Sequence, residues 1–180
     1  MTDWKYCPQC RKPLEPKQGQ TGETFPTCPE GHFTFYDSPD PSACAVVEQD
    51  GKYLVLRRNI EPNKGKWEIP GGFIDSGEGA EEALLREARE ETGLEVKIVR
   101  YIGSFPCAYG DTDLMTVSVA YHAAVTGGTF KLSREAKESR WVDLNEFPEM
   151  AFASDQRIVD AFVRSRKKPS TSNGPAILCR

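Results

Sequence analysis

Apolar and polar residues alternate in short runs through most of the chain, and these runs predict β-strands. Strands are expected over Ala43–Glu48 and Lys52–Arg58, because apolar residues dominate both segments and Asp50-Gly51 between them favours a tight hairpin. Val, Tyr and Thr are frequent in later segments that we also expect to be strands, at 95–104, 114–125 and 139–142.

Two further segments have the character of helices. In residues 154–166 one apolar stripe recurs at helical spacing, formed by Ile158, Val159, Phe162 and Val163. Most of the stretch from Gly72 to Leu94 is expected to be the second helix, with Gly93 at the position of its C-cap. A mixed sheet with one helix in its middle and one at its end fits an α/β sandwich.

Three parts of different composition follow one another along the chain. Residues 1–36 contain two short pairs of Cys and His and are expected to form a small N-terminal module. Residues 37–166 form the main domain, which begins with the linker Asp37-Ser38-Pro39-Asp40-Pro41, where proline disfavours regular structure. Residues 167–180 are polar and rich in turn-forming residues, so we expect a disordered tail.

Length and charge exclude several classes of protein. The 180 residues suit one domain of ordinary size with a small appendage. A net charge of -4 and a pI near 5.3 argue against a general binder of nucleic acid, which usually has a basic excess. The N-terminus lacks the apolar core of a secretory signal, and no apolar run is long enough to span a membrane. We therefore expect a soluble, cytoplasmic protein with no membrane partner.

The N-terminal cysteines have the spacing of a zinc site. Cys7 and Cys10 form a C-x-x-C pair, and Cys28 and His32 form a second pair. Thiolates and imidazole suit tetrahedral Zn²⁺, and two such pairs brought together across a hairpin make a zinc ribbon. Four protein ligands would close the site, so the zinc would be structural. The alternatives are two disulfides or a redox C-x-x-C, but nothing around residue 7 resembles the strand-helix unit that a redox motif normally opens.

The helix expected between Gly72 and Leu94 carries more acidic residues than a stable helix needs. Glu87, Glu90 and Glu91 fall on about one third of its circumference, where like charges destabilise a helix. A divalent cation such as Mg²⁺ would compensate, because it prefers oxygen ligands and commonly lies between carboxylates and phosphates. The simpler alternative is a solvated acidic face. Pro70-Gly71-Gly72 before the helix favours the first interpretation, because the backbone there can approach a ligand closely.

This stretch resembles the Nudix box, in which G, E, R-E, E-E and G-U recur at fixed spacings and U is aliphatic. Eight positions match: Gly72, Glu78, Arg86, Glu87, Glu90, Glu91, Gly93 and Leu94. Ala88 is the one departure, at a packing position. The resemblance extends over residues 42–162 and implies an α/β/α sandwich with a mixed sheet. The N-terminal pairs look like the zinc ribbon of a subset that includes NADH pyrophosphatases and some FAD or ADP-ribose pyrophosphatases.

The Nudix resemblance implies a metal-dependent hydrolase of nucleoside diphosphates linked to another group. Glu87 and Glu91 would be the principal ligands of Mg²⁺ or Mn²⁺, Glu90 would share metal or water contacts, and the carbonyl of Gly71 would complete the shell. Arg86 would hold the acidic cluster in place, and Glu78 would orient the loop that enters the helix.

The same resemblance leaves the general base open between three carboxylates. Glu90 and Glu87 are candidates within the box. In the zinc-ribbon subset a glutamate just before a strand tryptophan serves this role or binds metal, and Glu138 before Trp141 has that place.

The substrate is less well determined than the reaction. NADH pyrophosphatases carry an S-Q-P-W-P-F-P motif, whereas this chain has Ser104-Phe105-Pro106-Cys107-Ala108-Tyr109-Gly110, so NADH is not favoured over ADP-ribose or FAD. Substrate-binding candidates are aromatic residues that could stack on a ring and arginines that could pair with phosphates: Phe73, Phe105, Tyr109, Arg57 and Arg58.

Two other functions compete with hydrolysis of a small nucleotide. The fold could serve as a nucleotide sensor with the ribbon as an RNA or partner contact, but sensors usually lose box glutamates and here all are present. Hydrolysis of capped RNA ends needs the same box. Nudix enzymes are often homodimers, so the resemblance also allows a homodimer.

Overall fold

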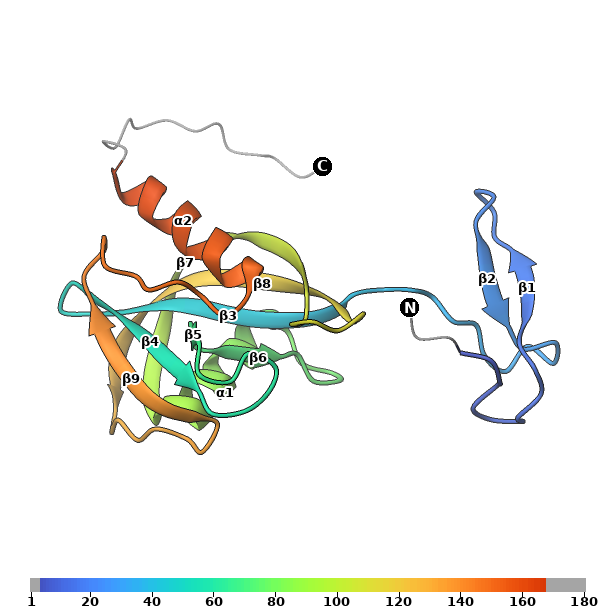
Figure 1. Cartoon of the computed structure of the whole chain (residues 1–180), viewed down its shortest axis with the longest axis horizontal. Helices are drawn as coiled ribbons and strands as arrows, with labels where there is room; N and C mark the ends of the chain where they lie inside the picture. Colours follow the sequence, from blue (N-terminus) through green and yellow to red (C-terminus); the bar gives the residue numbers. More distant parts are fainter. Residues whose placement is uncertain (1–3, 168–180) are drawn as a thin grey trace.

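The computed structural model describes residues 4–167, and Figure 1 shows them as a small hairpin and a larger α/β domain. The hairpin consists of β1 (Glu15–Gln18) and β2 (Thr24–Thr27), which pair antiparallel as a separate two-stranded sheet. This hairpin is the framework of the predicted ribbon. The predicted tail at 167–180 lies, apart from Lys167, outside the described residues.

The main domain is built on a seven-stranded mixed sheet. Its central path runs β5-β4-β3-β8-β7, with β6 paired to β3 and β9 paired to β4. β3 and β8 are parallel, and the other pairs are antiparallel. The strands are β3 (Asp40–Gln49), β4 (Lys52–Arg58), β5 (Trp67–Glu68), β6 (Gly71–Phe73), β7 (Leu94–Ala108), β8 (Met115–Gly128) and β9 (Ala136–Val142).

Two helices provide the apolar faces that complete two separate cores. α1 (Ala80–Thr92) buries Ala83 and Leu84 in one core, and α2 (Ala153–Lys167) buries Ile158 and Phe162 in the other. Along β3 the alternation of a strand sends Ala45 and Val47 to the α1 core, whereas Cys44 and Val46 enter the α2 core. The predicted α/β sandwich with a mixed sheet is confirmed. No helix among residues 4–167 is long and apolar enough to cross a membrane.

Element boundaries differ from the sequence prediction where pairing extends a strand. β3 begins at Asp40, inside the predicted linker, because Asp40 and Pro41 pair with Thr116 and Val117 of parallel β8. Pro41 is accommodated because its carbonyl accepts the N–H of Ile74, a role that needs no N–H of its own. β5 and β6 were not predicted, since two- and three-residue strands carry no periodic signal.

Candidate active site

Two glycines bring the backbone of β6 against the acidic face of α1. β6 pairs with β3 through Gly71 and Cys44, and a Cβ on Gly71 would lie 2.5 Å from the Cβ of Cys44. A Cβ on Gly72 would overlap the carboxylate of Glu87. Gly71 therefore has no room for a side chain against β3, and the absence of a side chain at Gly72 lets the Glu87 carboxylate lie directly against the chain.

Arg86 joins the carboxylates of the box. Its Nε and Nη2 donate to the two oxygens of Glu78 at 3.0 and 2.9 Å, a bidentate pair. Its Nη1 donates to Glu87 at 2.7 Å and to Glu90 at 3.2 Å, while Nη2 also reaches the carbonyl of Phe73 at 3.1 Å. These contacts link the acidic cluster to the loop that enters α1.

Glu91 is the buried member of the acidic face, with 9% of its surface exposed. Its Oε2 accepts the backbone N–H of Gly71 at 3.0 Å. Burial, together with the negative charges of Glu68, Glu87 and Glu135, raises the pKa of Glu91 well above its usual range. Burial also raises the pKa of Glu87. Carboxylates held this way gain from a cation that neutralises them.

The box opens onto a cavity of about 330 Å³. Its lining includes carboxylates, aromatic rings and the hydroxyl residues Ser42, Thr116 and Ser118. Of the predicted site residues, those that line the cavity are Arg58, Gly71, Phe73, Glu87, Glu90, Glu91 and Tyr109.

A second acidic group, which sequence reasoning missed, lies in the same cavity. Glu68 and Asp155 are both buried and both line it. Burial raises the pKa of Glu68 to about 7, against the opposing effect of Arg58. Burial and the charge of Glu68 raise the pKa of Asp155 to about 8. These acids have no common spacing in the sequence, since they come from β5 and the start of α2.

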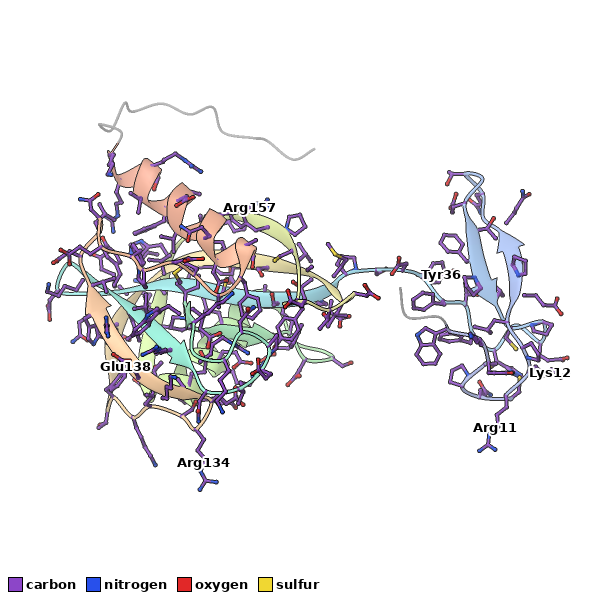
Figure 2. All side chains as sticks on the ribbon, in the orientation of Figure 1. Arg11, Lys12, Tyr36, Arg134, Glu138 and Arg157 are labelled. Carbon is purple, nitrogen blue, oxygen red and sulfur yellow. The ribbon has the colours of Figure 1, made fainter. Side chains whose placement is uncertain are left out.

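Arg57 and Glu138 do not line the cavity, although both were predicted to belong to the site. Arg57 donates to the carbonyl of Gly65 at 2.8 Å and to Glu138 at 3.1 Å. The other oxygen of Glu138 accepts two hydrogen bonds from Arg140, and Figure 2 shows Glu138 on β9. Both carboxylate oxygens are therefore occupied by arginines outside the cavity.

Glu135, three positions before Glu138 in the sequence, lines the cavity instead. Burial is the largest cause of the raised pKa values of Glu87 and Glu91, and the negative charge of Glu135 contributes to both. Glu135 therefore lies near both carboxylates. It was missed because spacing alone does not distinguish Glu135, in the turn before β9, from Glu138 on β9.

Three aromatic residues that line the cavity contact one another: Phe73 of β6, Tyr109 just after β7 and Phe152 just before α2. Phe73 and Tyr109 have ring centroids 5.4 Å apart, and Tyr109 stacks on Phe152 at 5.3 Å with 9° between the planes. Phe105 does not join them: it packs against the α2 core, with Arg157 5.5 Å from its ring. Phe152 was missed because nothing in the sequence distinguishes it from a core aromatic.

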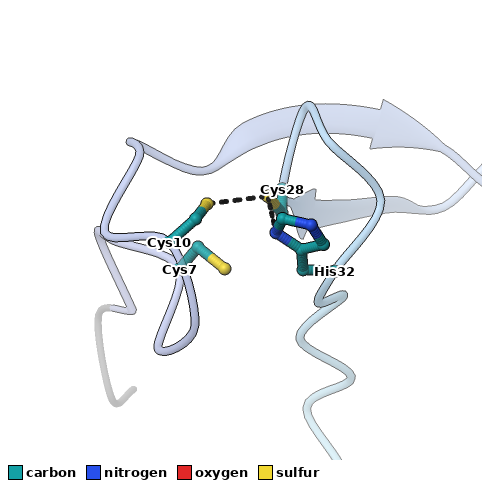
Figure 3. A group of neighbouring side chains, drawn as sticks. All are labelled: Cys7, Cys10, Cys28 and His32. Carbon is teal, nitrogen blue, oxygen red and sulfur yellow. Dashed lines mark hydrogen bonds between the residues drawn. The ribbon is translucent and has the colours of Figure 1, made fainter.

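The four predicted zinc ligands come together at the base of the hairpin (Figure 3). The ligand atoms of Cys7, Cys10, Cys28 and His32 all lie within 4.8 Å of one another. Cys28 Sγ is 3.5 Å from Cys10 Sγ and 4.0 Å from His32 Nδ1. Tetrahedral zinc with 2.3 Å thiolate bonds separates its ligands by roughly 3.8 Å, so the set suits zinc.

The turn formed by residues Cys7 to Cys10 also favours a thiolate at Cys7. Burial opposes ionisation, but N–H groups of Cys10 and Gln9 outweigh it and lower the pKa of Cys7 to about 7. The three cysteines are free thiols in the structure, which disagrees with the disulfide alternative. Within residues 4–167 this is the one group of three or more Cys, His, Asp or Glu side chains whose possible metal-ligand atoms lie this close together.

Comparison with known families decides what the acidic helix represents. The sequence matches the family described as NUDIX domain over residues 38–162, more than half of the chain. The chain belongs to the Nudix family. The match begins two residues before β3 and ends within α2, so the family domain is the whole larger body of Figure 1 without the ribbon.

Relatives of this Nudix protein include named pyrophosphatases. An ADP-ribose pyrophosphatase of Methanocaldococcus jannaschii is 35% identical over 128 residues, covering 71% of this chain and 76% of that protein. The NAD-capped RNA hydrolase NudC of Vibrio atlanticus is 30% identical over 148 residues, covering 82% of this chain and 52% of that protein. The mitochondrial NAD(P)H pyrophosphatase NUDT13 of Mus musculus is 31% identical over 140 residues, covering 76% and 39%. The chain thus spans about half of the length of NudC and less than half of the length of NUDT13.

Solved structures share the Nudix fold. A NUDIX hydrolase from Nitrosomonas europaea superposes with a TM-score of 0.77 at 24% identity, covering 90% of this chain and 92% of that chain. A MutT protein from Methanosarcina mazei Go1 gives a TM-score of 0.64 at 28% identity, covering 74% and 100%. With the glycines, the arginine and all the glutamates of the box in place and pyrophosphatases among its relatives, this chain is a Nudix hydrolase.

Proposed function

We propose that this Nudix hydrolase uses Mg²⁺ or Mn²⁺ to cleave the pyrophosphate bond of ADP-ribose or of a related dinucleotide such as NADH or FAD. The observation that carries the proposal is that one cavity holds both the box carboxylates and a group of aromatic rings. A nucleoside diphosphate linked to another group needs both kinds of surface, one for its phosphates and one for its base.

The donor set of the cavity suits a hard divalent cation. Glu87, Glu91 and Glu135 line the same cavity, the charges of Glu87 and Glu135 act on Glu91, and the backbone N–H of Gly71 is bonded to Glu91. We assign the metal to these groups, with Glu90 at the margin and Glu135 in place of Glu138. Bound Mg²⁺ or Mn²⁺ would neutralise the pyrophosphate and lower the pKa of an attacking water.

The remaining box residues would position the carboxylates and remove a proton from the attacking water. Arg86 fixes Glu87 and Glu90 through Nη1, so these carboxylates keep their positions before substrate arrives. Of the three box glutamates on α1, Glu90 is the most exposed, with 61% of its side chain accessible, and so can reach a water at the mouth of the cavity. We assign it the role of general base.

ADP-ribose is the first choice of substrate. One relative, of which this chain covers 76% of the length at 35% identity, is named an ADP-ribose pyrophosphatase. The aromatic rings that line the cavity, Phe73, Tyr109 and Phe152, supply the ring contact that the adenine would need.

A second candidate substrate is an RNA carrying a dinucleotide cap. Several relatives are named NAD-capped RNA hydrolase, and such a cap contains the same pyrophosphate bond. The cavity would then receive only the cap, and the RNA would extend from its mouth.

The N-terminal ribbon is proposed to bind zinc for structural purposes. Four protein ligands leave no open position for water or substrate. The zinc would hold the short β1-β2 hairpin, which has too little core to be stable alone.

One panel assay tests the proposed function. The purified chain is incubated with ADP-ribose, FAD, NADH, diadenosine polyphosphates and NAD-capped RNA, each with Mg²⁺ or Mn²⁺, and release of AMP or phosphate is measured. Turnover of ADP-ribose that disappears on chelation supports the proposal. Activity on none of them would reject it and favour a nucleotide sensor.

A further inference from the structure

Positive charge is concentrated in two segments that border the cavity. Residues 57–66 and 131–140 together contain eight Lys or Arg and three Glu, a net charge of +5. The whole chain has a net charge of -4, so the rest of the molecule is acidic. The same two segments supply part of the cavity lining, namely Arg58, Ile60 and Glu135.

Hydrogen bonds hold the two segments together. The backbone N–H of Asn59 donates to the carbonyl of Glu135 at 2.7 Å, and the side-chain amide of Asn59 donates to the carbonyl of Arg134 at 3.1 Å. A Cβ on Gly65 would lie 3.6 Å from Nζ of Lys137. The cations of the two segments therefore belong to one continuous surface.

The basic surface, as we call it, consists of five exposed cations: Lys64, Lys66, Lys131, Arg134 and Lys137. Within residues 4–167 no ion pair or side-chain hydrogen bond engages any of these five side chains. By contrast, Lys52 and Arg166 are paired with carboxylates elsewhere in the domain. Figure 2 shows Arg134 extending outward from the larger domain. These charges are therefore available to an external anion.

Protection of a sheet edge does not account for these cations. Lys and Arg commonly prevent exposed edge strands from pairing with other chains. β9 is such a strand, since β4 is its one partner among the described strands, but of the five residues only Lys137 lies on it. The other four lie in the segment before β9 and in the connection between β4 and β5.

The position of the basic surface suits a ligand that extends out of the cavity. None of its five residues lines the cavity, so a small dinucleotide held inside does not contact them. The five cations are spread over two segments and are not gathered around one point, which suits a chain of phosphates better than a single phosphate. An RNA strand provides such a chain, since a phosphodiester follows every nucleoside.

We propose that the basic surface binds the phosphate backbone of an RNA strand whose capped 5′ end occupies the cavity. The proposal rests on the second substrate of the proposed function and adds the path of the RNA across the protein. Flexible lysines supply point charges to phosphates, so the contacts are electrostatic and independent of the RNA sequence. The capped RNA is then a better ligand than its cap alone.

The test compares the binding of an NAD-capped RNA with the binding of NAD, by calorimetry in EDTA so that no turnover occurs. An RNA of about twelve nucleotides is long enough to cover such a surface. At 50 mM salt the wild-type chain should bind this RNA at least about tenfold more tightly than NAD. Between about 50 and 200 mM salt the Kd of the RNA should rise about 100-fold, as five phosphate contacts to a single strand require.

Two double variants remove charge from the basic surface, one in each segment: Lys64→Gln with Lys66→Gln, and Lys131→Gln with Arg134→Gln. Each should raise the Kd of the RNA about tenfold and lower the slope of log Kd against log salt by about 1.4. The Kd of NAD should stay within about twofold of the wild-type value, because NAD carries no phosphates beyond the cavity.

Two matched controls remove exposed cations from other parts of the chain. Arg164→Gln with Lys167→Gln changes α2, and Lys5→Gln with Lys17→Gln changes the ribbon. Each control pair should leave the Kd of the RNA within about twofold of wild type, because these charges lie away from the proposed path.

Three results would overturn the proposal. In the first, wild-type protein binds capped RNA no more tightly than NAD. In the second, a control pair weakens RNA as much as a pair from the basic surface, which would place the RNA elsewhere. In the third, a polyglutamate chain of similar length binds as tightly as the RNA, which would assign the surface to an acidic protein.

Binding in EDTA separates this proposal from the proposed function. A chain that binds capped RNA as described but hydrolyses nothing in the panel would reject only the proposed function. A chain that hydrolyses ADP-ribose but gives any of the three results above would reject only the path of the RNA.

Discussion

The backbone N–H of Gly71 donates a hydrogen bond to the carboxylate of Glu91 across 3.0 Å, and this contact ties β6 to the buried side of α1. The two residues are far apart in the chain, yet the bond fixes the position of a carboxylate that burial would otherwise disfavour. It makes Glu91 part of the frame of the site as well as a proposed ligand of its metal.

Glu91→Gln should separate these two roles. The amide oxygen can still accept the N–H of Gly71, whereas the charge needed for Mg²⁺ is lost. We expect kcat to fall by roughly 100-fold or more while the thermal midpoint stays the same or rises, since a buried acid has been replaced. Turnover at the wild-type rate would refute the assignment of Glu91 to the metal.

Gly72→Ala tests the close approach of the backbone to Glu87. The added Cβ would overlap the Glu87 carboxylate, which must move, so we expect a loss of about tenfold or more in kcat/KM. Gly79→Ala is the matched control, because its Cβ would meet only the carboxylate of Glu82 at 3.4 Å. Equal activity in the two variants would show that the position of Glu87 does not matter.

Glu135→Gln and Glu138→Gln distinguish the glutamate just before β9 from the glutamate on β9. Only Glu135 lines the cavity, so we expect Glu135→Gln to lower kcat about tenfold or more and to raise the Mg²⁺ concentration needed for half activity. Glu138→Gln loses ion pairs with Arg57 and Arg140 and should keep kcat within about threefold. A larger loss of kcat in Glu138→Gln than in Glu135→Gln would instead assign Glu138 to the site.

Cys28→Ser tests the zinc ribbon. The wild-type chain should carry about one equivalent of zinc by elemental analysis, and the variant should carry none, because the site loses a thiolate. The β1-β2 sheet is separate from the seven-stranded sheet, so hydrolysis should remain within about threefold of the wild-type rate. Cys107→Ser, which lies outside the zinc group, should retain the metal. A zinc content unchanged by Cys28→Ser contradicts the assignment.

The buried Asp155 predicts how stability depends on pH in metal-free protein. Burial, and then the charge of Glu68, raises the pKa of Asp155 from 3.8 to about 8, so between these values the folded state binds a proton that the unfolded state has lost. Stability should therefore fall as pH rises from about 4 to 8, by at most roughly 1.4 kcal/mol per pH unit from this group.

Asp155→Asn removes that titration. Thermal or urea unfolding in EDTA should show a flatter profile between pH 5 and pH 8 than wild type, with the variant gaining relative stability toward pH 8. A steeper profile in the variant, or parallel profiles, would mean that Asp155 is ionised in the folded protein at neutral pH.

Much of the reaction centre could be predicted because it is local. Glu87, Glu90 and Glu91 share a face by the geometry of a helix, and Gly72 and Gly93 mark its approach and its end; the structure places all three carboxylates at the cavity. The four residues proposed to bind zinc are equally local, since the members of each pair lie within five residues of one another in the chain. The α/β class followed from periodicity in the same way.

Arg57 and Arg58 show what periodicity left open. Neighbouring residues of a strand point to opposite faces, so one arginine of β4 had to leave the site. Which one stayed depended on the pairing of β4 with β9, whose register shifts at these two residues. Arg58 entered the cavity and paired with Glu68, while Arg57 paired with Glu138 outside it.

The sequence by itself determined the helix, its acidic face, the two zinc pairs and therefore the family, because each is a pattern of residues within a few turns of chain. Only the tertiary structure decided that Glu135 rather than Glu138 lines the cavity, that Phe105 belongs to a core, and that Phe152, Glu68 and Asp155 belong with the site. The physical reason is that these groups meet through the pairing of distant strands and the packing of α2, and no local periodicity records either.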